Sequence, residues 1–256
     1  MARERYLINA GEDTIHTNEI KPETPKEKRK NWWYYHKGPL IAGLLVFAAL
    51  FSIFFSIFSK VKPDYTVGVM TSYTMPDSGR MELERCLTEY ADDRNGDGKV
   101  VVNVVCYVFS TSMPSSADAL QQQQAAVARF AGDVLANESM IFLHNEEAFA
   151  FMQEDFRGFY QYNDGTPMPE TASDYENAMI PWKEIPALSE FVPKTEEEDS
   201  FDSDMLRQLF EDLRVSVREE EGTSITRKEN DMEYYEDSIA FYQRLLKGEK
   251  SSSPGE

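Results

Sequence analysis

The sequence contains few of the residues that most often bind transition metals. It has three histidines and two cysteines in 256 residues. His16 and His36 lie before a long apolar run, and only His144 lies after it. Zinc sites are built mainly from several His and Cys ligands, so a multi-histidine site is excluded in the part of the chain that follows the run.

Basic residues are also scarce. The chain has 26 Lys and Arg against 45 Asp and Glu, which gives a net charge of −19. Phosphate backbones are bound by clustered Lys and Arg side chains. The composition therefore predicts that nucleic acid is not a partner of this protein.

The common catalytic motifs are missing. The sequence has no G-x-S-x-G, H-E-x-x-H, Walker A or G-x-G-x-x-G pattern. A Ser–His–Asp site after the apolar run would have to use His144, and no motif in the sequence identifies a serine as its partner. We therefore expect a protein that is not an enzyme and has no cofactor, with a hydrolase as the catalytic alternative.

What the sequence does have is one long apolar run. Residues 39–58, "PLIAGLLVFAALFSIFFSIF", contain no charged side chain. A helix rises about 1.5 Å per residue, so a stretch of this length crosses a hydrocarbon core of about 30 Å. The run predicts one transmembrane helix over residues 38–59, and the membrane is therefore an expected partner.

The flanks of the run predict its orientation. Five basic residues precede it closely and two follow it: Lys26, Lys28, Arg29, Lys30 and Lys37 before, Lys60 and Lys62 after. The side that carries more Lys and Arg remains in the cytoplasm. Trp32, Trp33, Tyr34 and Tyr35 lie where an interfacial aromatic belt is expected. We therefore expect a single-pass protein of the cell membrane with a cytoplasmic N-terminus and an extracellular C-terminal part.

A cleaved signal peptide fits the sequence less well. The leader is long, the apolar run exceeds a usual h-region, and neither an A-x-A site nor a lipoprotein cysteine follows it. Residues 1–37 are polar and are predicted to be a disordered cytoplasmic tail, with a docking tail as the alternative. Residues 251–256 are predicted to be a second disordered tail.

Residues 60–250 show strand and helix patterns in alternation. Three apolar, β-branched segments each precede a segment with helical periodicity. The expected strands are 64–73, 99–109 and 139–143, and the helices are 77–93, 115–138 and 145–156. Alternating strands and helices predict parallel pairing. We expect an extracellular α/β domain, a three-layer sandwich with a mostly parallel sheet of about four to five strands.

Local signals add detail to these helices. Ser116 and Asn145 precede the second and third helices and are expected to cap them. In the second helix, the apolar residues at helical spacing are expected to form the buried stripe. This stripe consists of Leu120, Val127, Phe130 and Val134.

The last part of the domain is less regular. Residues 157–200 form a long, acidic connector rich in proline, which we expect to be pinned by Trp182, Ile185 and Leu188. A lid is the alternative, because long loops are often functional. Residues 213–218 are predicted to be a strand, although a helix could continue through them. A final helix is expected over 230–248.

A short loop before the second strand resembles the opening of a calcium-binding loop. Asp93, Asn95 and Asp97 fit D-x-[DN]-x-[DN]-G. Position 12 of such a loop is normally a bidentate Glu, and here it is Val104. Asn-Gly and Asp-Gly pairs also favour a tight turn. We expect a structural turn, with calcium as the alternative.

Two further features leave alternatives open. Cys86 and Cys106 lie in the domain expected outside the cell, where a disulfide is stable. We expect two buried free thiols that pack as small apolar residues, with a disulfide as the alternative. Ala48, Ser52 and Ser56 recur at every fourth position of the apolar run. Such faces let helices approach closely, so a homodimer or a membrane-protein partner through this helix is an alternative to a solitary span.

The segment from "DYTVGVMTSY" (64–73) to "ESMIFLHNEEAFAFM" (138–152) resembles the first lobe of bacterial extracellular solute-binding proteins of the type 2 class. The resemblance rests on the order of strands and helices over about ninety residues. It departs from that family in having a membrane anchor and room for only part of a second lobe. The resemblance implies that ligand-binding positions lie in the loops at the strand ends, namely Thr71, Ser72, Tyr73, Ser110, Thr111, His144 and Asn145.

These patterns together predict a membrane-anchored extracellular domain that binds or interacts without catalysis. An accessory or scaffold role is favoured, because half of a clamp encloses a small ligand poorly. A solute receptor that uses residues 157–200 as a lid is the first alternative. A hydrolase that uses the strand-end loops is the second.

Overall fold

The computed structural model describes residues 24–58, 62–112, 116–153, 158–194 and 202–251. The chain divides into two compact units, residues 1–60 and 61–256. The predicted tail over 251–256 and the first 23 residues of the predicted N-terminal tail lie almost wholly outside the described residues.

The described part of the first unit is a single helix, α1 (Pro25–Phe58). Among the described residues it is the one helix that is long and apolar enough to cross a membrane. Its start at Pro25 corrects the prediction of a disordered tail up to residue 37. Residues 26–37 contain no glycine or internal proline, so the helix extends into them from the apolar run without a local break. Pro39 lies inside the helix and interrupts its hydrogen-bond ladder once.

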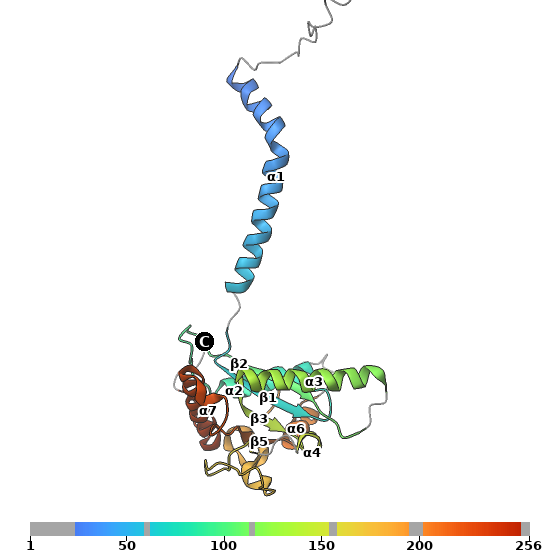
Figure 1. Cartoon of the computed structure of the whole chain (residues 1–256), viewed down its shortest axis with the longest axis vertical. Helices are drawn as coiled ribbons and strands as arrows, with labels where there is room; N and C mark the ends of the chain where they lie inside the picture. Colours follow the sequence, from blue (N-terminus) through green and yellow to red (C-terminus); the bar gives the residue numbers. More distant parts are fainter. Residues whose placement is uncertain (1–23, 59–61, 113–115, 154–157, 195–201, 252–256) are drawn as a thin grey trace, which may run out of the picture. The chain divides into compact units, whose positions relative to one another are not determined.

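The second unit combines five strands with helices (Figure 1). Its elements follow one another in this order: β1 (Tyr65–Thr71), α2 (Asp77–Thr88), β2 (Val102–Val108), α3 (Ala117–Ala136), β3 (Ser139–His144), α4 (Glu146–Met152), β4 (Ile180–Pro181), α5 (Pro186–Ser189), α6 (Ser203–Glu211), β5 (Arg214–Val217) and α7 (Glu229–Lys247). Three short 3-10 turns complete it: η1 (Tyr175–Ala178), η2 (Trp182–Glu184) and η3 (Ile225–Arg227).

The five strands form one open sheet in the order β2-β1-β3-β5-β4. β1 is parallel to β2 and β3, whereas β5 is antiparallel to both β3 and β4. The sheet is thus mixed and only partly parallel. Crossovers that contain α2 and α3 return the chain to the same edge for the first three strands. The chain instead enters β5 at the carboxyl edge of β3, where Arg214 pairs with His144, so β5 runs the opposite way.

Hydrophobic side chains cover both faces of the central strands. Val69 and Leu143 belong to a cluster that includes residues of α2 and α7. Phe142 belongs to a second cluster that includes Phe130 of α3 and residues of α4. All six residues of β3 are buried. Gly68 of β1 is required at this packing, because a Cβ there would lie 2.5 Å from the Phe142 ring.

The helix caps are as predicted, but the buried stripe of α3 is not. The side chains of Ser116 and Asn145 each accept a hydrogen bond from a backbone N–H of the helix that follows. Phe130 is buried and Val134 half-buried, whereas Leu120 and Val127 are exposed. The prediction is therefore confirmed for Phe130 and wrong for Leu120 and Val127, because a polar residue, Asp133, shares the inward side of α3. Asp133 is buried and accepts hydrogen bonds from the Tyr107 hydroxyl and from Ser139.

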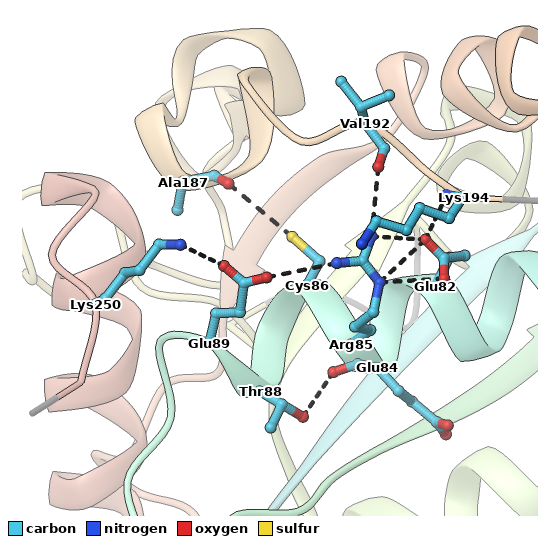
Figure 2. Close-up of polar contacts among 10 residues, drawn as sticks. All are labelled: Glu82, Glu84, Arg85, Cys86, Thr88, Glu89, Ala187, Val192, Lys194 and Lys250. Carbon is cyan, nitrogen blue, oxygen red and sulfur yellow. Dashed lines mark hydrogen bonds and ion pairs between the residues drawn. The ribbon is translucent and has the colours of Figure 1, made fainter. Parts of the chain in front are cut away.

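The connector is anchored to the domain at several points. Trp182, Ile185 and Leu188, the residues expected to pin it, are all buried. Figure 2 shows Arg85 of α2 donating to the carbonyl of Val192, with Lys194 donating its backbone N–H to Glu82. The connector also contributes β4, a two-residue strand that the sequence did not reveal. Residues 195–200 of the predicted connector lie outside the described residues.

Two alternatives left open by the sequence are resolved here. Residues 214–217 form β5, so the strand prediction over 213–218 is confirmed. Cys86 and Cys106 are free thiols. Burial raises the pKa of Cys86 to about 12 and that of Cys106 to about 11, so both thiols are held in the protonated form.

The anchoring of the connector predicts how two aliphatic substitutions in it differ. Leu188 is 0% exposed and Val192 is 60% exposed. Leu188→Ala should lower the free energy of unfolding by about 2–5 kcal/mol, whereas Val192→Ala should change it by less than about 0.5 kcal/mol. Urea unfolding of the full chain in detergent, followed by circular dichroism, measures both. Equal effects of the two substitutions would show that the connector is not packed as described.

Candidate functional site

The carboxyl edge of the three parallel strands brings the predicted ligand-binding positions together. Thr71 at the end of β1 pairs with Val108 of β2, and Met70 pairs with His144 of β3. The chain following β2 stays attached, because Phe109 donates its N–H to the carbonyl of Thr71 at 2.9 Å. The three strand-end loops therefore lie side by side, as the parallel pairing requires.

Asn145 links the loop after β3 to the loop after β1. Its side-chain carbonyl caps α4 by accepting from the Ala148 N–H at 3.0 Å. Its side-chain amide donates to the Ser72 hydroxyl at 3.0 Å, and its backbone N–H donates to the carbonyl of Met70. The amide group of Asn145 therefore bonds to neighbouring residues of this edge, through both its carbonyl and its NH2 group.

Glu147 is the residue of this edge that the sequence reasoning missed. Its carboxylate accepts hydrogen bonds from the hydroxyls of Ser110 at 2.9 Å and Thr111 at 3.3 Å. Hydrogen bonds from Ser110 and Ser72 lower the pKa of Glu147 below its ordinary value. Its position in the first turn of α4 was visible in the sequence, but its partners lie in loops that only the folded sheet brings close. One carboxylate of α4 thereby joins hydroxyls of the loops after β1 and β2.

Thr71 and Tyr73 also direct their polar groups into the fold. Thr71 is fully buried, and its hydroxyl donates to the carbonyl of Tyr73 at 2.6 Å. The Tyr73 hydroxyl donates to the carbonyl of Leu209 at 3.4 Å. Burial, with a smaller effect of Asp212, raises the pKa of Tyr73 to about 12. Both side chains support the edge from within.

His144 is enclosed by aromatic rings. It is 0% exposed, and its ring centre lies 5.2 Å from that of Phe149 and 6.0 Å from that of Tyr160. Neither ring nitrogen has a hydrogen-bond partner among the described residues. Burial, assisted by the positive charge of Arg214, lowers the pKa of His144 to about 3. The imidazole is therefore neutral near pH 7 and is not presented to a substrate.

A cavity of about 460 Å³ opens at the same edge. Its lining combines four carboxylates with a single guanidinium; the residues are Asn145, Glu146, Glu147, Pro181, Glu211, Asp212, Leu213 and Arg214. Of the predicted ligand-binding positions, only Asn145 belongs to this lining. The charge of the cavity suits a small polar molecule that carries a positive charge.

The loop that resembles a calcium site is a network of local hydrogen bonds. Asp93 accepts from the backbone N–H groups of Gly96, Asp97 and Gly98, and Asn95 and Asp97 each accept from the N–H two residues later. Gly96 and Gly98 have φ of 71° and 83°, a conformation that favours glycine. Val104, where a bidentate Glu would be needed, lies inside β2. In the parts of the chain that the structure describes, no group of three or more His, Cys, Asp or Glu side chains could hold a metal ion.

The environment of His144 predicts a specific dependence of stability on pH. The pKa of this group is lower in the folded state than its ordinary value of 6.5, so the unfolded chain binds the extra proton. Stability from this group is complete above pH 6.5 and is lost as the pH falls toward 3. Between pH 7 and pH 5 the loss should be about 2 kcal/mol.

His144→Leu should remove this loss, because leucine does not titrate. Denaturant unfolding of the full chain at pH 7, 6 and 5 compares the slopes of the two proteins. His36→Gln, a substitution in α1, is the matched control and should keep the slope of the unsubstituted protein. Parallel slopes for the His144→Leu and unsubstituted proteins would contradict a buried, neutral imidazole.

Comparison of the chain with protein-family models, with curated proteins and with solved structures gave no match. The functional interpretation therefore rests on the residues and geometry of this chain.

Proposed function

We propose that the protein is a single-pass membrane protein with a cytoplasmic N-terminus, whose α/β domain is a non-catalytic interaction module outside the cell. An accessory or scaffold role is the specific form of this proposal. The apolar helix α1 and the excess of basic residues before its apolar run support the anchor and its orientation.

The observation that carries the interaction role is the exposed face of α3. Only Phe130 and Asp133 of its 20 residues are buried. Leu120, Val127 and Leu135 are 46%, 39% and 78% exposed. Helical residues turn by about 100° each, so spacings of seven and eight residues place these three side chains on one side. Gln124 and Ala131, both exposed, lie between them on the same side.

These residues form the α3 stripe, which consists of Leu120, Gln124, Val127, Ala131 and Leu135. A helix with such a stripe can pack against an apolar surface of another protein. Exposed apolar side chains aligned in this way lose contact with water when a partner covers them. Apolar positions recurring on one helix face are the feature that helix-binding grooves recognise. Figure 1 shows α3 lying along one side of the sheet, and most of its residues are exposed.

A solute receptor is the second candidate, and the edge cavity favours it. The cavity of about 460 Å³ has the size of a small-ligand site. The lid that this alternative needs is not supported, because Trp182 and Leu188 are buried and Val192 and Lys194 are bound to α2. A hydrolase that uses His144 is disfavoured, because this ring is enclosed by Phe149 and Tyr160.

We also propose that the domain is a three-layer sandwich related to one lobe of type 2 solute-binding proteins. Separate hydrophobic clusters on the two faces of the sheet support a three-layer α/β sandwich. The alternation of β1, α2, β2, α3, β3 and α4 supports the relationship to one lobe of type 2 solute-binding proteins.

Position-specific photocrosslinking in native membranes tests the interaction role. Benzoylphenylalanine replaces Val127 on the α3 stripe and, as the control, Gln122 on the opposite, also exposed side of the helix. We expect a discrete adduct from position 127 and none from position 122. Leu120→Glu with Leu135→Glu should abolish the adduct and leave the free energy of unfolding within about 0.5 kcal/mol. The absence of an adduct at position 127, or identical adducts at both positions, would refute the proposed surface.

A further inference from the structure

The N-terminal part of α1 differs in chemistry from the apolar run that it continues. Residues 26–37, the basic–aromatic segment, contain five basic residues, one acidic residue and four large aromatic residues. Trp32, Trp33, Tyr34 and Tyr35 are all exposed. Residues 1–37 carry a net charge of +2, whereas the rest of the chain carries −21. This segment is therefore the part of the chain whose charge and aromatic content suit an anionic surface.

The helix places this segment at a defined depth. Because α1 is continuous from Pro25 to Phe58, its rise of about 1.5 Å per residue carries through the segment. The aromatic residues lie about 6–10 Å before Pro39, and Lys28 and Arg29 lie about 15 Å before it. The headgroup region of each leaflet is about 5–8 Å thick. Tyr34 and Tyr35 then lie at headgroup level. The rings of Trp32 and Trp33 and the long basic side chains start just outside this level and can reach back to it.

Two basic and two aromatic side chains of the segment share one face of the helix. Lys28, Arg29, Trp32 and Trp33 line a common open hollow, because positions four apart lie one above the other. Near the apolar run, the Lys37 ammonium lies 5.2 Å from the centre of the Tyr34 ring. Within the described residues, none of the five basic side chains of the segment forms an ion pair. The cations are thus available to an external anion.

We propose that the basic–aromatic segment binds the anionic phosphodiester headgroups of the leaflet in which it lies. This inference rests on the proposed membrane anchoring and adds a lipid selectivity to it. The aromatic rings occupy the interface, while Lys26, Lys28, Arg29 and Lys30 attract lipids whose headgroups carry a net negative charge. A soluble polyanion fits the geometry less well, because the same helix continues directly into twenty uncharged residues.

Quenching of tryptophan fluorescence by brominated lipids tests this selectivity. The chain has three tryptophans, and Trp182→Phe leaves only Trp32 and Trp33 as emitters. The full chain is reconstituted in phosphatidylcholine vesicles that contain about a third phosphatidylglycerol, a composition that resembles anionic bilayers. In parallel samples, an equal amount of either lipid carries bromine in its acyl chains.

Anionic lipid enriched around the segment should quench about twice as strongly as phosphatidylcholine at equal bromine content, and the ratio should approach one at about 1 M salt. Neutralising Lys26, Lys28, Arg29 and Lys30 to Gln should also bring the ratio to one. Lys60→Gln with Lys62→Gln, on the other side of the apolar run, is the matched control and should leave the ratio unchanged. If Trp182→Phe does not fold, subtracting the emission of a Trp32→Phe, Trp33→Phe variant isolates the same signal.

Two results would overturn the inference, and they differ in what else they affect. Equal quenching by the two brominated lipids, with both effective, would leave the membrane anchor in place and refute the lipid selectivity. No quenching by either lipid would show that Trp32 and Trp33 do not lie in a bilayer, which would refute the proposed anchor together with the inference.

Discussion

The proposed topology of the whole chain depends on one constraint on the backbone of α1. In a hydrocarbon medium every N–H and C=O must find its partner within the chain, and a helix achieves this by itself. The uncharged run 39–58 is long enough to do so across a bilayer. If α1 occupies a membrane, the basic residues before the run and the acidic domain after it are held on opposite sides. Orientation, lipid contact and the proposed address of the domain then follow from one helix.

Within the domain, the polar groups at the carboxyl edge are used by the fold itself. Glu147 gathers the hydroxyls of the strand-end loops, Asn145 ties two of these loops together, and His144 is sealed beneath aromatic rings. An edge satisfied in this way is stable, but it presents few free groups to a substrate. The exposed α3 stripe has the opposite character, since its apolar side chains gain contacts only when another surface covers them. This contrast is the reason why we propose that the domain binds a partner and does not catalyse a reaction.

Much of the fold could be predicted from period and turn signals, and the failures have specific causes. The first three strands, the caps Ser116 and Asn145 and the strand over 213–218 follow from local pattern. β4 has only two residues, one of them Pro181, and is too short to leave a periodic signal. The buried stripe predicted for this helix was wrong at Leu120 and Val127, because Asp133 is buried by partners from β2 and β3 that local sequence does not show. The role of Glu147 was missed for the same reason.

Labelling of single introduced cysteines in intact cells tests the central claim most directly. Met81→Cys places a thiol at a site of α2 that is 59% exposed and lies outside the α3 stripe, and Ala10→Cys places one before α1. The natural thiols of Cys86 and Cys106 are buried or half-buried, and the unsubstituted chain measures their background. A membrane-impermeant maleimide should label Met81→Cys in intact cells and Ala10→Cys only after lysis. Labelling of Met81→Cys that requires lysis would contradict the account.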